Sequence, residues 1–162
     1  MATDPHAAQL LVSRLARAGQ TLCVAESCTG GLLGGAITSV PGSSEVFWGG
    51  VISYDDGAKT RLLSVPRETL VRCGAVSREV AEAMARGVRA ISGSTWGLSV
   101  TGIAGPDGGT EEKPVGTVWI AVAGPSPAAR RHHFCGDREH VREDTVEAAM
   151  SLLTSCVCGN GP

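Results

Sequence analysis

Helix-like and strand-like segments alternate along almost the whole chain, and this alternation limits the fold more than any other feature. Apolar spacing and Gly, Pro and Ser positions predict helices over 8–18, 32–39, 58–63, 67–73, 77–91 and 138–156, and strands over 21–25, 46–54, 96–103, 115–123 and 130–135. Such alternation places helices on both faces of one sheet. The last three strands are separated by loops, so at least one pair is antiparallel. We therefore predict an α/β fold, a three-layer α/β/α sandwich with a mixed, mainly parallel sheet.

The chain reads as one domain. It has 162 residues, of which 43% are hydrophobic, and we see no internal repeat, low-complexity tract or linker. We predict a single domain over 1–162 with its core at about 7–156. No apolar stretch is long enough to cross a bilayer, and the first residues lack the pattern of a secretory signal, which predicts a cytoplasmic protein without membrane contact.

Charge and cysteine usage exclude several classes of function. The net charge is −2, from 14 basic and 16 acidic residues, which disfavours a nucleic-acid partner. The one dense basic run, 130–133, is interpreted as a solvated edge strand. The six cysteines contain no CxxC pair, and Cys156-x-Cys158 is interpreted as a helix end, so we expect reduced thiols, no metal and no cofactor.

The first polar cluster follows the strand predicted over 21–25. Ser27 and Thr29 precede Gly30 and Gly31, at the expected start of a helix. Backbone N–H groups at a helix start favour an anion, and glycines let a ligand approach the backbone. The alternative is that Ser27 or Thr29 is simply the N-cap of the helix.

A serine nucleophile needs a base, and the sequence offers a lysine. None of the histidines (His6, His132, His133 and His140) lies in a Gly-rich turn or beside an expected acid. Lys59 is the alternative, because a desolvated lysine has a depressed pKa and can accept a proton. Tyr54, five positions earlier, is a candidate to hold or relay that proton. The alternatives are a solvated helix lysine and a half-buried strand aromatic.

Two further clusters are candidates for substrate contacts. Thr101, Gly102 and Gly105 lie in a Gly-rich loop directly after an apolar strand, where several N–H groups can face one substrate atom. The loop lacks the patterns of a P-loop and of a dinucleotide fold. Arg138 opens the last predicted helix, where its planar fork suits a phosphate. The alternative is an ion pair with Asp137 or Glu139.

Together these clusters resemble the CinA C-terminal-domain family, the nicotinamide-nucleotide amidases. The resemblance covers about residues 7–156 and is carried by the stretches 25–31, Tyr54-x4-Lys59, 74–77, 101–109, 113–118 and 136–138. Some members of the family carry an additional N-terminal domain, and this chain resembles the stand-alone form. The resemblance implies deamidation of nicotinamide mononucleotide to nicotinic acid mononucleotide and ammonia, without a cofactor.

The resemblance also implies roles for individual residues. Ser27 attacks the carboxamide carbon, and Lys59, assisted by Tyr54, takes and later returns the proton. The oxyanion is held by N–H groups around 29–31 or in the 102–105 loop, and Arg138 holds the phosphate of the substrate. The implied substrate-binding residues are Thr29, Gly30, Gly31, Thr101, Gly102, Gly105 and Arg138.

Two other functions stay open from the sequence. A cysteine hydrolase using Cys28 would share the same helix start, but it lacks a paired base. A non-catalytic module that binds a ligand or partner, of the competence or damage-inducible type, is the alternative from another class. Trp48 or an apolar helix face is a candidate homodimer interface.

Overall fold

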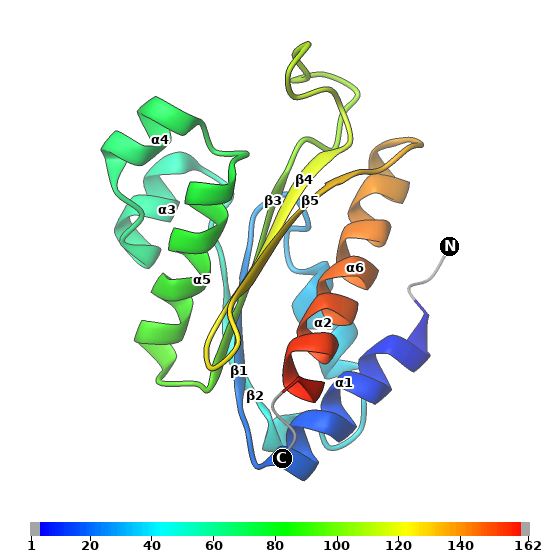
Figure 1. Ribbon diagram of the computed structural model, residues 1–162. Helices are drawn as coiled ribbons and strands as arrows, with labels where there is room; N and C mark the ends of the chain where they lie inside the picture. Colours follow the sequence, from blue (N-terminus) through cyan, green and yellow to red (C-terminus); the bar gives the residue numbers. More distant parts are fainter. Residues whose placement is uncertain (1–3, 160–162) are drawn as a thin grey trace.

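The computed structural model describes residues 4–159, and in them six α-helices enclose one five-stranded sheet (Figure 1). The first three and last three residues of the predicted 1–162 domain lie outside the described part. The elements are α1 Pro5–Ala18, β1 Leu22–Glu26, α2 Leu32–Thr38, the 3-10 helix Ser43–Glu45, β2 Phe47–Ile52, α3 Asp56–Leu63, α4 Arg67–Cys73, α5 Arg78–Ser92, β3 Trp96–Gly102, β4 Thr117–Ala123, β5 Ala128–His133 and α6 Arg138–Cys158.

The predicted three-layer sandwich is confirmed. Figure 1 shows α1, α2 and α6 on one face of the sheet and α3, α4 and α5 on the other. The strand order is β2-β1-β3-β4-β5, with β1 parallel to both β2 and β3. The pairs β3–β4 and β4–β5 are both antiparallel. The sheet is mixed as predicted, but its pairings divide evenly between parallel and antiparallel, because each of the last two strands follows its predecessor through a loop.

The central strand β1 brings polar residues to the carboxyl edge of the sheet. All five of its residues are buried. Its neighbour β3 runs in the same direction, with Glu26 opposite Val100, so the chain after both strands emerges at the same edge. The Ser27 N–H donates to the Val100 carbonyl at 3.1 Å and continues the ladder by one residue.

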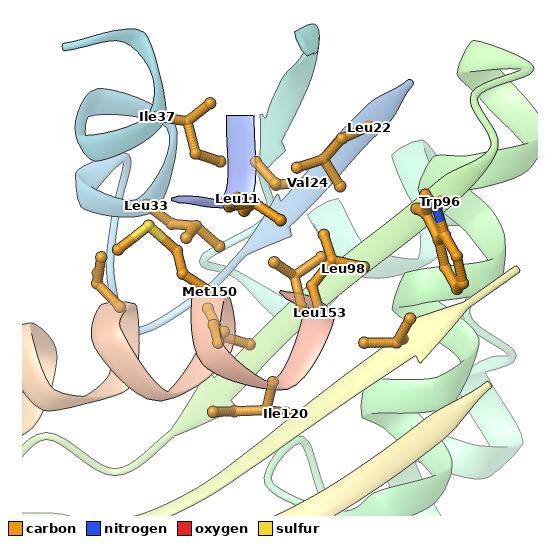
Figure 2. Close-up of a cluster of buried hydrophobic side chains, with 14 of the residues drawn as sticks. Leu11, Leu22, Val24, Leu33, Ile37, Trp96, Leu98, Ile120, Met150 and Leu153 are labelled. Atoms are coloured by element: carbon orange, nitrogen blue, oxygen red, sulfur yellow. The ribbon is translucent and has the colours of Figure 1, made fainter. Parts of the chain in front are cut away.

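The core beneath α1, α2 and α6 is aliphatic. Figure 2 shows side chains from the sheet meeting those of these helices. The fully buried members include Leu11, Leu22, Val24, Leu33, Ile37, Leu98, Ile120, Met150 and Leu153. Burying such side chains contributes about 1.5–3 kcal/mol each, so this layer fixes α6 firmly against the sheet.

On the opposite face, α5 lies very close to the sheet because small residues meet there. Ala81 and Ala85 pack against Ala121 and Ala123. Gly97 leaves the space, since a Cβ there would stand 2.1 Å from the Ala85 carbonyl oxygen. Ser77 is the N-cap of α5, and its hydroxyl accepts from the Val80 N–H.

The apolar spacing along 77–91 predicts a core stripe of Val80, Ala83, Met84, Gly87, Val88 and Ile91, and Ile91 does not lie in the core. Ile91 is 51% exposed, whereas Val80 and Val88 of the same stripe are fully buried. The last buried residue of α5 is Val88, so the final turn of the helix does not contribute to the core.

Replacing Gly87 with alanine is expected to destabilise the fold by about 1–3 kcal/mol, the usual range for overpacking. A Cβ at this position of α5 would lie 2.1 Å from the backbone oxygen of Leu63, which cannot rotate away. Chemical denaturation measures the change. Gly35→Ala in α2 is the control, since no atom lies within 4 Å of its Cβ position. Equal stability of the two variants would contradict this account of the α3–α5 contact.

Gly49-Gly50 within the predicted strand 46–54 indicates a bulge or a close backbone approach, and the edge strand β2 shows both. The register with β1 shifts between Leu22 and Cys23, which leaves Trp48 as the extra residue of a bulge. A Cβ on Gly50 would stand 2.8 Å from a methyl group of Val24, so the two strands approach closely there. Trp48 is exposed on this edge, and its role in a homodimer stays a prediction.

The opposite edge of the sheet is β5, as predicted for the basic run. Arg131 Nη2 donates to the Glu112 carbonyl at 2.8 Å, and His133 Nε2 lies 3.1 Å from the Val115 carbonyl oxygen. Two members of the run therefore anchor the long loop between β3 and β4. No helix within residues 4–159 is long and apolar enough to cross a membrane.

Candidate active site

Most of the predicted site residues meet in one cavity of about 220 Å³ at the carboxyl edge of β1 and β3. The cavity is lined by Ser27, Cys28, Tyr54, Asp56, Lys59, Ala75, Val76, Thr101, Gly102, Ala104 and Arg138. Among these are all three predicted catalytic residues and three of the seven predicted substrate-binding residues. The other four, Thr29, Gly30, Gly31 and Gly105, lie outside the lining.

Lys59 is a buried lysine, not the solvated one that the sequence left as an alternative. It lies on α3, which begins where Asp55 accepts the Gly57 N–H at 2.7 Å. The side chain is 1% exposed. Its Nζ lies 3.2 Å from Ser27 Oγ, 2.9 Å from the Ser53 carbonyl oxygen and 3.1 Å from the Tyr54 carbonyl oxygen. The amine is thus fixed beside the serine.

Burial changes the protonation of this amine. Desolvation lowers the pKa of Lys59 below its ordinary value, because the buried site disfavours the charged form. Asp56, whose Oδ1 lies 3.6 Å from Nζ, opposes the shift by stabilising the cation. The net direction favours a neutral amine that can accept a proton.

Tyr54 contacts Lys59 through its backbone and not through its phenol. Its hydroxyl accepts a hydrogen bond from Arg138 Nη2 at 3.0 Å, and the side chain is 59% exposed. The predicted proton relay from the phenol to Lys59 is therefore not the arrangement in this structure. The phenol stands on the side of the cavity where Arg138 lies.

Arg138 is held toward the cavity. Its Nη1 donates to the Gly105 carbonyl at 2.8 Å, so it binds the Gly-rich loop and Tyr54 and makes neither of the ion pairs left open from the sequence. Asp137 instead accepts from His140 Nδ1 at 2.7 Å. A histidine therefore does lie beside an acid, contrary to the sequence interpretation, but the pair is exposed and His140 does not line the cavity.

The start of α2 is not open to an anion, because a side chain of the protein already occupies it. Glu26 is 2% exposed, and its carboxylate accepts from the Thr29 hydroxyl at 2.5 Å and the Gly31 N–H at 3.0 Å. It also accepts from the N–H groups of Leu33 and Gly34. The predicted ligand role of the Thr29 hydroxyl and the Gly31 N–H is revised accordingly, since both donate to Glu26.

The turn between β1 and α2 still offers backbone donors beside Ser27. The Gly30 N–H donates to the Ser27 carbonyl at 3.1 Å and closes the turn. Gly30 and Gly31 have φ of 55° and 106°, the left-handed region that glycine adopts without strain. Within the part of the chain that the structure describes, the N–H groups of Cys28 and Thr29 donate to no other residue.

The Gly-rich loop after β3 shapes the wall of the cavity. The Thr101 hydroxyl donates to the Ala75 carbonyl at 2.9 Å and ties β3 to the loop before α5. A Cβ on Gly102 would lie 2.6 Å from a methyl group of Val118 and 3.2 Å from Cys28 Sγ. Gly102 is therefore needed for space, and Gly105 contributes its carbonyl to Arg138.

Cys28 lies in the same wall as a buried, protonated thiol. Burial raises its pKa to about 12, far above neutral pH. A cysteine nucleophile needs the thiolate, and no histidine lines this cavity. This environment favours Ser27 over Cys28 as the reacting group.

Two residues of the site carry no role predicted from the sequence. One is Glu26, in the stretch 25–31, whose carboxylate occupies the start of α2. The other is Arg142, whose Nε donates to the Cys28 carbonyl at 3.0 Å. Its spacing of four from Arg138 on a predicted helix was the available signal, because such residues share a face. No group of His, Cys, Asp or Glu among residues 4–159 is arranged to hold a metal ion.

The protein is of the α/β class, with a mixed sheet between two helix layers. A buried serine–lysine pair lies at the carboxyl edge of its parallel strands. The model of the CinA C-terminal domain matches residues 4–157, and the chain belongs to that family. It is 50% identical over 155 residues, 94% of its length, to a CinA-like protein of Geobacter metallireducens. It is also 63% identical over 113 residues to a CinA-like protein of a Synechococcus strain.

Solved structures of the same family share the fold. The competence/damage inducible protein CihA from Agrobacterium tumefaciens is 38% identical, with a TM-score of 0.89 and 94% of each chain covered. A CinA superfamily protein from Klebsiella pneumoniae is 32% identical, with a TM-score of 0.92 over 96% of this chain and 98% of that one. The chain spans only 38% and 27% of the length of the Geobacter and Synechococcus relatives.

Proposed function

We propose that this chain is an amidohydrolase that converts nicotinamide mononucleotide into nicotinic acid mononucleotide and ammonia. The observation that carries the proposal is the contact of 3.2 Å between the buried Lys59 Nζ and Ser27 Oγ, inside a cavity that Arg138 also lines. An activated hydroxyl attacks an acyl carbon, and a cation beside it suits a phosphorylated substrate. The choice of substrate rests on family resemblance.

The hydrogen-bond partners of Lys59 Nζ determine the direction of the lone pair that its neutral amine carries. A charged lysine has three N–H donors, and Nζ has three oxygen neighbours here, the carbonyls of Ser53 and Tyr54 and Ser27 Oγ. Carbonyl oxygens can only accept hydrogen bonds, so the two N–H groups of a neutral amine donate to the carbonyls of Ser53 and Tyr54. Its lone pair then faces Ser27 Oγ, the one neighbour that can donate. This is the geometry of a general base.

The reaction then runs in two balanced steps. Ser27 Oγ forms a bond to the carboxamide carbon while its proton moves to Lys59 Nζ. The carbon–nitrogen bond breaks, and ammonia leaves with that proton. Water attacks the resulting ester, Lys59 takes a proton from the water, and the restored Ser27 hydroxyl receives it as the acid is released.

The oxyanion of each step needs donors beside Ser27. The N–H groups of Cys28 and Thr29 are the candidates, because Glu26 engages Gly31 and the Ser27 carbonyl engages Gly30. The N–H that follows a nucleophilic residue is a common oxyanion donor. Of these two candidates, Thr29 lies within the range 29–31 expected from the sequence, and Cys28 lies one residue before it.

Replacing Arg138 with methionine is expected to raise KM for nicotinamide mononucleotide by about 10–150-fold, the equivalent of a lost charged hydrogen bond of about 1.5–3 kcal/mol. The guanidinium is exposed beside the cavity and can turn from the Tyr54 hydroxyl to a phosphate. Steady-state kinetics with nicotinamide riboside is the control, since that substrate has no phosphate. An equal rise of KM for both substrates would contradict a phosphate role.

Thiol reagents are expected to leave activity unchanged at pH 7.5. Cys28 has a pKa of about 12, so almost none of it is thiolate, whereas Cys135 is exposed and accessible to the reagent. Iodoacetamide treatment followed by peptide mass mapping and an ammonia assay makes the comparison. Loss of activity in proportion to Cys28 alkylation would favour the cysteine hydrolase.

Ammonia release by the purified protein tests the function itself. Nicotinamide mononucleotide, nicotinamide riboside and nicotinamide are compared at equal concentration, with a coupled ammonia assay and chromatography of the acid product. We expect the mononucleotide to react with the highest kcat/KM and to give ammonia and acid in equal amounts. If none of the three compounds releases ammonia, the proposed function is wrong. That result would favour a non-catalytic module of the competence or damage-inducible type.

A further inference from the structure

The turn that carries Ser27 is held by two opposite charges from different parts of the chain. Glu26, at the end of β1, accepts from the Gly31 N–H and from the Thr29 hydroxyl. Arg142 of α6 binds its carbonyl groups, with Nε 3.0 Å from the Cys28 oxygen and Nη2 3.1 Å from the Thr29 oxygen. The guanidinium fork thus binds two consecutive peptide units, Cys28–Thr29 and Thr29–Gly30, which follow the peptide between Ser27 and Cys28.

Holding these carbonyls also fixes the N–H groups of the same peptide units. In a trans peptide the C=O and N–H bonds point in opposite directions. The Cys28 carbonyl shares its peptide with the Thr29 N–H, which is one of the two candidate oxyanion donors. The Thr29 carbonyl shares its peptide with the Gly30 N–H, which donates to Ser27. By binding the Cys28 carbonyl, Arg142 therefore sets the direction of the Thr29 N–H, which points away from the guanidinium.

The contact depends on the firm packing of α6. Val141 and Thr145, on the same stretch of this helix, are fully buried, so the backbone that carries Arg142 is fixed against the sheet. A Cβ at position 30 would meet Arg142 Nη2 at 3.5 Å, an ordinary contact, so glycine is favoured there by its φ of 55° and not by lack of space. The helix that presents Arg138 to the cavity also holds the turn of the nucleophile.

We propose that Arg142 is a positioning residue for catalysis, which orients the Cys28–Thr29 peptide as an oxyanion donor and holds Ser27 Oγ against Lys59. The proposal rests on the proposed function, because it assigns a role in the same acyl transfer. Arg142 acts through the backbone of the turn and is not among the residues that line the cavity. Its loss should affect the transition state and leave the binding of substrate almost unchanged.

Three variants test the proposal. Arg142→Ala removes the guanidinium, and we expect kcat to fall by about 10²-fold with KM nearly constant, as expected for a small misplacement of reacting groups. Arg142→Lys should keep part of the rate, since an ammonium is a single point charge and not a fork. Arg17→Ala, an exposed arginine on α1, is the matched control and should keep wild-type kinetics.

Further readouts separate positioning from a purely structural role. Millimolar guanidinium should restore a large part of kcat in Arg142→Ala and leave Arg17→Ala unchanged. The pH dependence of kcat/KM should keep its midpoint, because Arg142 is not among the groups that set the pKa of Lys59. A wild-type kcat in Arg142→Ala would overturn the proposal. So would a loss of kcat that follows a lowered Tm and does not recover with guanidinium.

A second measurement does not depend on the substrate. Phenylmethanesulfonyl fluoride forms a bond from its sulfur to an activated serine oxygen and releases fluoride, so its rate reports how well Ser27 is placed. We expect Arg142→Ala to slow the labelling of Ser27 and added guanidinium to restore it. If the wild-type protein labels at Ser27 but releases no ammonia, the proposed function fails while this assay still decides the role of Arg142. Equal labelling rates in wild type and Arg142→Ala would overturn that role.

Discussion

Replacing Ser27 with alanine is expected to lower kcat for ammonia release by at least about 10⁴-fold, since removal of a nucleophilic serine has effects of this size or larger. The hydroxyl is the only group within the described cavity lining that is both held against a base and free to form an ester. The fold should survive, because the change removes one oxygen from a side chain that is 8% exposed and adds no bulk.

The control for this variant is Ser13→Ala, an exposed serine on α1 that is remote in sequence from the site. Circular dichroism and thermal melting of both variants establish that each is folded before the ammonia assay. Substantial activity in the folded Ser27→Ala variant would show that another group attacks the amide, and the assignment of the nucleophile would be wrong.

Replacing Lys59 with methionine is expected to lower kcat/KM by about 10²–10⁴-fold, the usual contribution of a general base. Methionine approximates the length of lysine and fills the buried space without the amine. The loss should be greatest near neutral pH, where wild type uses the lowered pKa of Lys59. Steady-state rates from pH 6 upward provide the measurement, with Arg61→Met on the exposed surface of α3 as the control.

The same lysine links stability to pH with a defined sign. Burial lowers the folded-state pKa of Lys59, so between that value and about 10.4 the unfolded chain binds more protons than the folded one. Its contribution to the free energy of unfolding therefore rises with pH through this window and falls as the pH drops toward the folded-state pKa. Urea denaturation of wild type and Lys59→Met at several pH values should show this component only in wild type.

Much of the fold was predictable because local signals agree with tertiary packing. Helix α4 has the predicted bounds, Arg67–Cys73, since Pro66 and Gly74 mark its two ends in the sequence. The bulge in β2 follows from Gly49-Gly50. The exposure of Ile91 was not predictable, because a helical stripe does not indicate where the helix stops touching the sheet.

In the candidate site too, some features were predictable from the sequence and others were not. The sequence predicts three of the site residues from their side-chain chemistry and their positions at strand ends or helix starts. These are Ser27, Lys59 and Arg138, and the structure brings all three to one cavity. The partner of each side chain was not predictable. Arg138 binds Tyr54 across 84 positions, and Arg142 binds Cys28 across 114 positions. Such contacts depend on how the layers pack, and the local sequence contains no signal for them.

The pairing of Ser27 as nucleophile with Lys59 as base can be tested by the pH dependence of Ser27 labelling with phenylmethanesulfonyl fluoride. Peptide mapping locates the modified residue. We expect one label, on Ser27, whose rate of formation rises with pH around a midpoint below the ordinary pKa of lysine and falls strongly in Lys59→Met. A label on another residue, or an equal labelling rate with and without Lys59, would contradict this pairing.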